Sequence, residues 1–294
     1  MMKNIGFIGL GNMGSKMSIN LAQKNFTVTG YDLEYTTSLM TELDNFGIVL
    51  TNDINNAIKD QDVVITMLPD GKALKNVILP NYKVANKGTV FIDSSTVDIT
   101  TTKTIYDVLK NDNFDFLDAP VSGGVIGAKN ATLTFMVGGS ERTFKYCEPL
   151  FKVMGNKSIL CGNSGSGQSI KLCNNMILAM TMYGLKETLN LAKSLNIDLQ
   201  KLFDVVSTSS GSCWAVNNYF PVKNVGPNSP ADNDFLPGFS TNLMVKDFSL
   251  AIEAAKQFNI DTKIGKEILE RYEEIIKNGR GNLDFSYIVE NNLN

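Results

Sequence analysis

The stretch that decides the fold covers residues 6–21 and reads GFIGLGNMGSKMSINL. Its three glycines, Gly9, Gly11 and Gly14, follow an apolar run in the spacing G-x-G-x-x-G. The first permits a tight turn off a strand, the second lets a pyrophosphate approach the backbone, and the third lets a helix pack on the strand. We therefore predict a strand and then a helix from Met13 to about Lys24, whose first N–H groups face phosphates. The alternative is a glycine-rich turn without a ligand.

The residue that ends the second predicted strand, TVTGYD, indicates whether the cofactor is NAD or NADP. It closes with Asp32, near the ~20-residue offset expected for an acid that binds the adenosine ribose diol. A 2′-phosphate beside that carboxylate costs on the order of 3 kcal/mol per pair of unit charges at ~5 Å. No Lys or Arg occurs between Asn25 and Ile58 to offset this repulsion. We therefore predict NAD as the cofactor, the alternative being that Asp32 is only a turn residue. The predicted contacts in the glycine loop are Gly9, Leu10, Gly11, Asn12, Met13 and Gly14.

The pattern of predicted secondary structure changes near the middle of the chain. Up to about residue 162, short β-rich runs alternate with helical or loop segments, which predicts an α/β Rossmann domain with a mostly parallel, doubly wound sheet. After Gly165 we find no convincing strand. A long, largely buried helix over residues 167–197 and helical runs at 198–208, 243–258 and 263–278 predict an all-α part. The GNSGSG stretch marks the boundary, which gives an NAD-binding domain at 1–163 and a helical substrate and dimerisation domain at 164–294.

Composition excludes several classes of function. The 294 residues carry a net charge of −3, which favours neither a nucleic-acid nor a membrane partner. The chain has no histidine, so Ser-His-Asp chemistry, His metal sites and imidazole proton shuttles are excluded. We expect no metal, and reduced, mostly buried thiols at Cys147, Cys161, Cys173 and Cys213. No targeting leader is visible, which predicts a soluble intracellular protein, mitochondrial in a eukaryote and otherwise cytoplasmic.

Without histidine, the proton carrier must be Lys, Asp, Glu, Tyr or Cys, and GQSIKLCNN offers the strongest candidate. Lys171 and Asn175 are four residues apart in a predicted helix, so they share one face. A neutral lysine can take a hydroxyl proton as hydride leaves, and an amide can hold the reacting oxygen. This helix follows the predicted domain junction, where ligand clefts form. The alternative is an ordinary helix lysine at the surface.

Three further stretches bear on a site. DAPVSGG, at residues 118–124, is predicted to end a strand at the carboxyl edge of the sheet, where Ser122, Gly123 and Gly124 offer a hydroxyl and bare N–H groups to a carboxylate. LMVKDFSLA places Lys246 and Asp247 at the start of a helix. The alternatives are a glycine turn and a surface ion pair worth under about 1 kcal/mol. Residues 207–242 form a long loop whose aromatic residues argue against disorder and favour a functional role.

Together these motifs identify a family. After GFIGLGNMG the chain carries ITMLP, FIDSST, DAPVSGG, LTFMVGG, GQSIKLCNN and LMVKD in order over essentially its whole length. In these motifs it resembles the β-hydroxyacid dehydrogenases, and SSGSCW, NNYFPV and PGFSTNLMVKD resemble the branch that acts on 3-hydroxyisobutyrate. The resemblance implies a Rossmann domain, an all-helical domain and a homodimer or homotetramer. It also implies NAD-dependent oxidation of 3-hydroxyisobutyrate to methylmalonate semialdehyde, a step in valine breakdown.

The resemblance further implies roles for single residues. Lys171 is expected to be the catalytic acid and base, Asn175 to orient the substrate, and Lys246 to reach both cofactor and substrate. The substrate carboxylate is expected at Ser122, Gly123 and Gly124. The cofactor is expected against Leu68, Pro69 and Thr96.

Departures and alternatives stay open. Where the family usually has glycine this chain has Ala131, and we expect Asn130 to take the left-handed conformation instead. Ala73 stands near the place where some members make a polar contact to the nicotinamide ribose. One alternative is a sibling reductase acting on tartronate or succinic semialdehyde, against which the loop around Trp214 argues. Another is a non-catalytic protein that senses NAD(H), which would not need Lys171 and Asn175 on one helix face.

Overall fold

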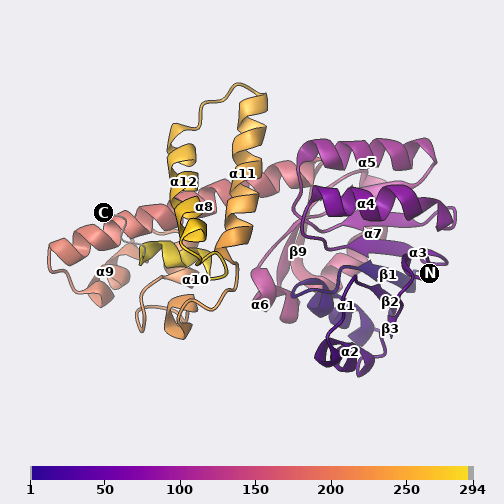
Figure 1. The fold of residues 1–294 in the computed structure, drawn as a ribbon, viewed down its shortest axis with the longest axis horizontal. Coiled ribbons are helices and arrows are strands. Elements are labelled where there is room, and N and C mark those ends of the chain that lie inside the picture. The colour runs from indigo at the N-terminus through magenta and orange to yellow at the C-terminus, as the bar shows by residue number, and fades with distance from the viewer. Residues whose placement is uncertain (1, 291–294) are drawn as a thin grey trace. The chain divides into compact units, whose positions relative to one another are not determined.

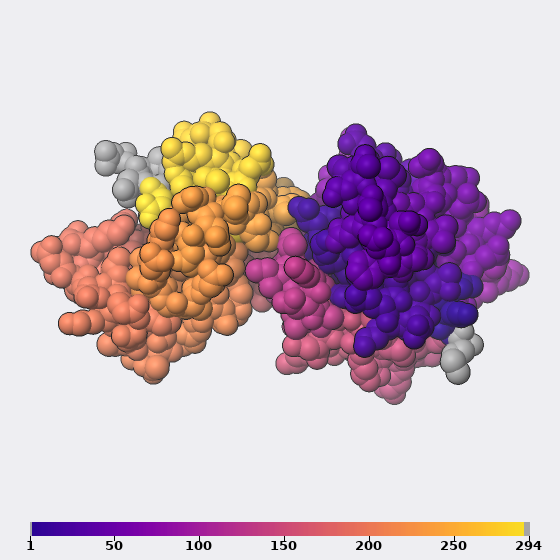
Figure 2. Space-filling view, turned by 90° about the horizontal axis from the view of Figure 1, so that it is seen from below, coloured from indigo at the N-terminus to yellow at the C-terminus, as the bar shows by residue number. Residues whose placement is uncertain are grey.

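The chain divides into two compact units. The structure, a computed structural model, describes residues 2–290. The first unit ends at Lys171 and the second begins at Leu172, inside the long helix α8 (Ser166–Ser194). Figure 1 shows strands and helices in the first unit and helices in the second, so the predicted α/β fold followed by a helical part is confirmed. In the space-filling view the chain of each unit packs into a continuous body, indigo to magenta in the first and salmon to yellow in the second (Figure 2).

The first unit is built on one sheet. Among the described residues nine strands lie in the order β3-β2-β1-β4-β5-β6-β8-β7, with β9 paired to β8. The pairs from β3 to β6 are parallel, whereas β8 runs antiparallel to β6 and β7. Because β1 lies between β2 and β4, the sheet has its switch point at β1, where open α/β sheets bind ligands. The strands are β1 (Asn4–Ile8), β2 (Thr27–Tyr31), β3 (Val49–Leu50), β4 (Val63–Thr66), β5 (Val90–Asp93), β6 (Asp115–Asp118), β7 (Val121–Ser122), β8 (Leu133–Gly138) and β9 (Gly155–Gly162).

Both faces of this sheet are buried. Phe7 on β1 and Ile65 on β4 belong to one apolar cluster. Their neighbours Ile8 and Val64 belong to another. Successive side chains of a strand point to opposite faces, so each face needs its own helices. One face packs against α1 (Gly14–Gln23), α2 (Thr37–Asp44), α6 (Gly124–Lys129) and α7 (Glu141–Met154). The other packs against α3 (Ile54–Ile58), α4 (Gly71–Asn81) and α5 (Ile99–Asn111) (Figure 1).

The second unit is helical. It holds the end of α8 and the helices α9 (Leu199–Val206), α10 (Trp214–Tyr219), α11 (Thr241–Gln257) and α12 (Lys263–Lys277). The 3-10 turns η2 (Pro230–Asn233) and η3 (Phe285–Val289) complete it. Helices α11 and α12 pack closely, because a Cβ on Gly265 would lie 2.8 Å from the Ile252 side chain. None of the helices in the described part of the chain is long and apolar enough to cross a membrane.

The prediction that the cysteines are mostly buried is wrong. All four are free, but only Cys147 is buried, Cys161 and Cys213 are half-buried, and Cys173 is exposed. On α8, Ile170, Cys173 and Ile177 recur at helical spacing and form an exposed stripe. The long helix is therefore less buried than predicted, because apolar composition does not show which face of a helix packs.

The expectation for Asn130 is also wrong. Asn130 has a φ of −89°, whereas Ala131 itself takes the left-handed conformation, with a φ of +55°. Asn130 closes helix α6 as its C-cap, and the turn reverses one residue later, where Thr132 N–H donates to Gly127 O at 2.9 Å. The chain therefore holds an alanine in a conformation that costs an L-residue about 1–2 kcal/mol.

Candidate active site

The three opening glycines have different structural reasons. Gly9 has a φ of +93°, and a Cβ on Gly14 would lie 1.9 Å from Gly9 O, so both positions exclude a larger residue. A Cβ on Gly11 would meet nothing within 4 Å. The protein's own packing therefore does not require Gly11, whose bare backbone leaves room for a ligand. Met13 is the N-cap of α1 and provides no side-chain hydrogen bond, so no capping side chain occupies the start of the helix, where a phosphate would bind.

The Asp32 side chain is hydrogen-bonded to this glycine loop. Strands β1 and β2 pair in register from Asn4 with Thr27 to Ile8 with Tyr31, so their carboxyl ends lie side by side. The Asp32 carboxylate accepts a hydrogen bond from Leu10 N–H at 2.6 Å and another from Leu33 N–H at 2.7 Å. Asp32 thus braces the glycine loop in addition to any contact with a ribose.

The remaining predicted cofactor and carboxylate residues of the first unit follow neighbouring strand ends. Thr66, Asp93 and Asp118 are paired across β4, β5 and β6. The segments after these strand ends therefore line one edge of the sheet, and they contain Leu68, Pro69, Thr96, Ser122, Gly123 and Gly124. Gly123 and Gly124 have φ values of +136° and +62°, which only glycine adopts without strain.

Two buried acids lie behind this edge, and sequence analysis missed both as site elements. Burial raises the pKa of Asp93 to about 6, against hydrogen bonds from Ser95 and Thr66 that lower it, and the charge of Asp118 raises it further. Burial also raises the pKa of Asp118, opposed by backbone hydrogen bonds that include those from Gly165 and Gln168. Asp118 Oδ1 accepts from Gly165 N–H at 2.7 Å and Oδ2 from Gln168 N–H at 3.0 Å. Asp118 therefore fixes the start of α8.

Helix α8 carries the predicted catalytic pair. Lys171 is 7% exposed and Asn175 is 1% exposed. Their four-residue spacing on one continuous helix puts them about one turn apart on the same side. An ordinary surface lysine is inconsistent with this burial.

In the second unit, a buried acid joins two of the predicted residues. Asn175 Nδ2 donates to Asp247 Oδ2 at 2.7 Å, and Lys246 Nζ lies 3.0 Å from Asp247 Oδ1. Asp247 is 3% exposed, so its pair with Lys246 is not the exposed surface pair considered as an alternative. Sequence analysis left Asp247 out of the site. Its only signal was helical spacing, because Met244, Asp247, Phe248 and Ala251 share the buried face of α11.

Residues 207–242, predicted as one long loop, contain helix α10 and the turn η2, and they are held by one carboxylate and a stack of rings. Asp284 accepts hydrogen bonds from the Tyr219 hydroxyl at 2.8 Å and from the Phe239 backbone at 3.0 Å. The Tyr219 ring stacks between Trp214, at 5.1 Å, and Phe285, at 5.5 Å. Trp214 ends the stack and is 53% exposed, so a large apolar face is held in a fixed orientation.

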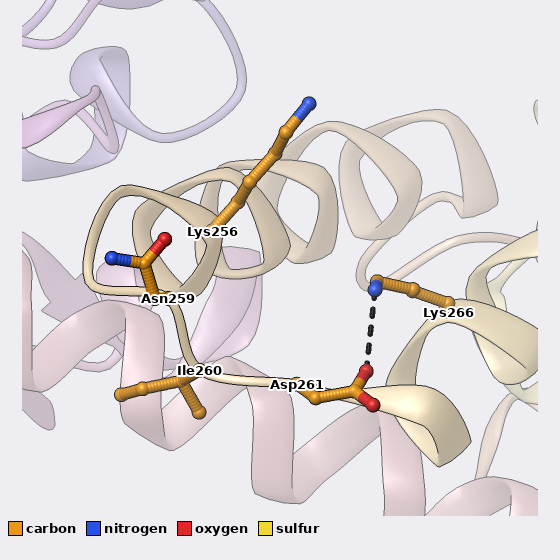
Figure 3. A pocket seen from close by; sticks show the side chains of 5 residues that line it. All are labelled: Lys256, Asn259, Ile260, Asp261 and Lys266. Carbon is orange, nitrogen blue, oxygen red and sulfur yellow. Dashed lines mark hydrogen bonds and ion pairs between the residues drawn. The ribbon is translucent and has the colours of Figure 1, made fainter.

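A hollow on the second unit lies elsewhere. It is lined by Lys256, Asn259, Ile260, Asp261 and Lys266, with Lys266 Nζ 3.3 Å from Asp261 Oδ1 (Figure 3). None of the predicted site residues lines it. No group of His, Cys, Asp or Glu among the described residues has the arrangement of a metal site.

A doubly wound sheet with a glycine loop braced by an acid is typical of a dinucleotide-binding protein, and the buried Lys171 on α8 adds a candidate proton carrier, so the class indicated is a dinucleotide-dependent oxidoreductase. Comparison with known proteins agrees. Residues 4–162 match the family described as the NAD binding domain of 6-phosphogluconate dehydrogenase. Residues 165–291 match the NAD-binding domain of NADP-dependent 3-hydroxyisobutyrate dehydrogenase. The chain belongs to the 3-hydroxyisobutyrate dehydrogenase family and is an NAD-dependent oxidoreductase.

Relatives match along the whole chain. The probable 3-hydroxyisobutyrate dehydrogenase of Mycobacterium tuberculosis is 40% identical over 98% of this chain and 97% of its own length. The mitochondrial 3-hydroxyisobutyrate dehydrogenase of Drosophila melanogaster is 38% identical over 98% of this chain and 89% of its own length. A solved structure of the Mycobacterium tuberculosis enzyme with L-serine, 40% identical, superposes with a TM-score of 0.92 over 99% of both chains.

Proposed function

We propose that the protein oxidises 3-hydroxyisobutyrate to methylmalonate semialdehyde, with NAD as the oxidant. The observation that carries this proposal is the nearly inaccessible Lys171, one helical turn before an asparagine that Asp247 holds. A protein that only senses NAD(H) has no use for this pair. The relatives named 3-hydroxyisobutyrate dehydrogenase support the choice of substrate.

The residues divide the chemistry between them. NAD, when bound, supplies the hydride acceptor. Lys171, in its neutral form, takes the hydroxyl proton of the substrate, so that the C–H electron pair leaves as hydride and a C=O bond forms. Asn175 orients the reacting oxygen, and its amide is held by Asp247, which accepts from Nδ2, and by Asn174, which donates to Oδ1 at 3.1 Å. Ser122, Gly123 and Gly124 hold the substrate carboxylate, and Lys246 adds a positive charge.

A panel of short hydroxyacids, read by NADH absorbance, tests the substrate. It should include 3-hydroxyisobutyrate, L-serine, glycerate and 4-hydroxybutyrate. We expect the highest kcat/KM with 3-hydroxyisobutyrate. A higher value with glycerate or 4-hydroxybutyrate would favour the reductases of tartronate or succinic semialdehyde. Tight NADH binding without turnover of any acid would favour the sensor.

The preference for NAD over NADP is proposed to come from Asp32. Replacing Asp32→Ala together with Leu33→Arg removes a negative charge beside the ribose and adds a positive one on an 86% exposed position. We expect the ratio of kcat/KM for NADP to that for NAD to rise at least about 100-fold, which corresponds to the ~3 kcal/mol of one charge pair. Asp32→Ala alone is the control for the lost brace on Leu10. An unchanged ratio in the double variant would refute the assignment.

A homo-oligomer, dimer or tetramer, is proposed as the working form. The exposed side chains of Ile177 and Leu191 on α8, and of Leu195 directly after it, support it, since each is at least 60% exposed. Light scattering after gel filtration would measure the mass. The cellular location is proposed to follow the source: the relatives from animals are named mitochondrial and the mycobacterial ones are not.

A further inference from the structure

Gln168 is a fully buried polar side chain for which the proposed chemistry has no role. Its Oε1 accepts a hydrogen bond from Val97 N–H at 3.2 Å, and its Nε2 donates to Ser95 O at 2.8 Å. Both partners belong to the loop after β5, on either side of Thr96. One amide therefore holds the backbone on both sides of a predicted cofactor contact.

The same loop is tied to its neighbour. Leu68 N–H donates to Ser95 Oγ at 2.8 Å, which connects the segment after β4 to the segment after β5. The predicted cofactor contacts Leu68 and Pro69 thus share a support with Thr96. Displacing Ser95 would displace both segments.

The other end of Gln168 is equally fixed. Its backbone N–H donates to Asp118, and a Cβ on the preceding Gly167 would lie 2.3 Å from Met136 O. The first turn of α8 therefore packs closely on the sheet, with no room for a side chain at Gly167. Lys171 follows three residues later, which is about 4.5 Å along the helix axis.

We propose that Gln168 is a positioning residue that sets the cofactor loop after β5 in register with Lys171 on α8. Two hydrogen bonds of its amide connect the loop that would hold the cofactor with the helix turn that leads to the base. The catalytic half of this inference rests on the proposed function. The cofactor half does not, because it concerns NADH binding alone.

The test compares Gln168→Met, which keeps the length of the side chain but removes both hydrogen bonds, with the wild type. We expect the Kd for NADH, measured by fluorescence titration, to rise about tenfold, as the loss of two hydrogen bonds implies. With 3-hydroxyisobutyrate, kcat should fall by about tenfold or more while the KM of the acid changes less than about threefold. Ser169→Ala is the matched control. It removes a hydrogen bond to Gly165 O from the same helix turn without touching the loop.

A residue with a merely structural role would lower the thermal midpoint and leave NADH affinity and kcat of the folded protein unchanged. That result in Gln168→Met would overturn the proposal. If Gln168→Met does not fold, Gln168→Glu takes its place, because it keeps the acceptor for Val97 while losing the donor to Ser95. If neither variant folds, the bridge serves folding rather than cofactor placement, and the proposal also fails. A wild type that binds NADH but does not oxidise the acid refutes the proposed function, and the NADH titration still decides the cofactor half.

Discussion

Gly11 and Gly14 belong to one loop but are glycines for different reasons. A Cβ at Gly14 collides with backbone, whereas a Cβ at Gly11 meets open space. We expect Gly14→Ala to lower the free energy of unfolding by about 2 kcal/mol or more, as overpacking does. Gly11→Ala should stay within about 0.5 kcal/mol of wild type and should weaken NADH binding through its new methyl group.

Urea denaturation measures the stability of Gly11→Ala and Gly14→Ala, and NADH titration measures their cofactor affinity. Each variant serves as the control for the other. Equal losses of stability would show that both glycines are structural. Unchanged NADH affinity in Gly11→Ala would show that the cofactor does not approach this loop.

Ala131 is strained by its own backbone. Because its φ is +55°, replacing Ala131→Gly should raise the free energy of unfolding by about 1 kcal/mol. The matched control is Ala73→Gly in helix α4, where glycine should instead lower it by about 0.5–1 kcal/mol. Thermal or urea unfolding of both variants decides the point. A loss of stability in Ala131→Gly would contradict the strain.

At the scale of elements, strands β4 and β5 are joined through a carboxylate that is costly to charge. Thr66 Oγ1 donates to Asp93 Oδ1 at 2.8 Å, yet burial still raises the pKa of Asp93 to about 6. In the unfolded chain an aspartate has a pKa of about 3.9. Asp93 therefore contributes stability that is fully present below that value and is lost as the pH rises through about 6, a total of about 3 kcal/mol.

Asp93→Asn removes this dependence. We expect its free energy of unfolding, relative to wild type, to increase by up to about 3 kcal/mol between pH 4 and pH 7. Asp112→Asn is the control and should change little over this range, because a hydrogen bond from the Tyr82 hydroxyl lowers the pKa of Asp112 and its titration therefore falls below this window. Urea unfolding across this range measures both variants. Parallel stability curves for Asp93→Asn and wild type would contradict the assignment.

The start of α8 shows why some elements escape sequence analysis. The GNSGSG stretch resembles a flexible linker, but its last glycine, Gly167, packs against Met136 O and Asp118. Asp118 itself stands in the apolar run FLDAP, where nothing local reveals that its carboxylate caps a helix almost fifty residues later. Helix caps supplied by distant residues leave no local signal, whereas a Ser or Asp next to a helix does.

At the scale of the molecule, the features that could be predicted are those with a periodic sequence pattern or a fixed residue spacing. The alternation of strands and helices, the glycine loop and the long helix α8 were each visible in sequence. The two-residue strands β3 and β7 were not predicted, because they are too short for a pattern. The buried acids Asp93, Asp118, Asp247 and Asp284 also escaped. An acid is expected at the surface unless its partners are known, and these partners come from elsewhere in the fold.

The most direct test of the account is the turnover of Lys171→Ala with NAD and 3-hydroxyisobutyrate, with the Kd for NADH measured on the same preparation. Lys193→Ala, an exposed lysine on the same helix, is the control. Removing the proton carrier should lower kcat by about 10²–10⁴-fold and leave NADH affinity within about threefold of wild type. A Lys171→Ala enzyme that binds NADH and turns over as fast as the Lys193→Ala control would contradict the account.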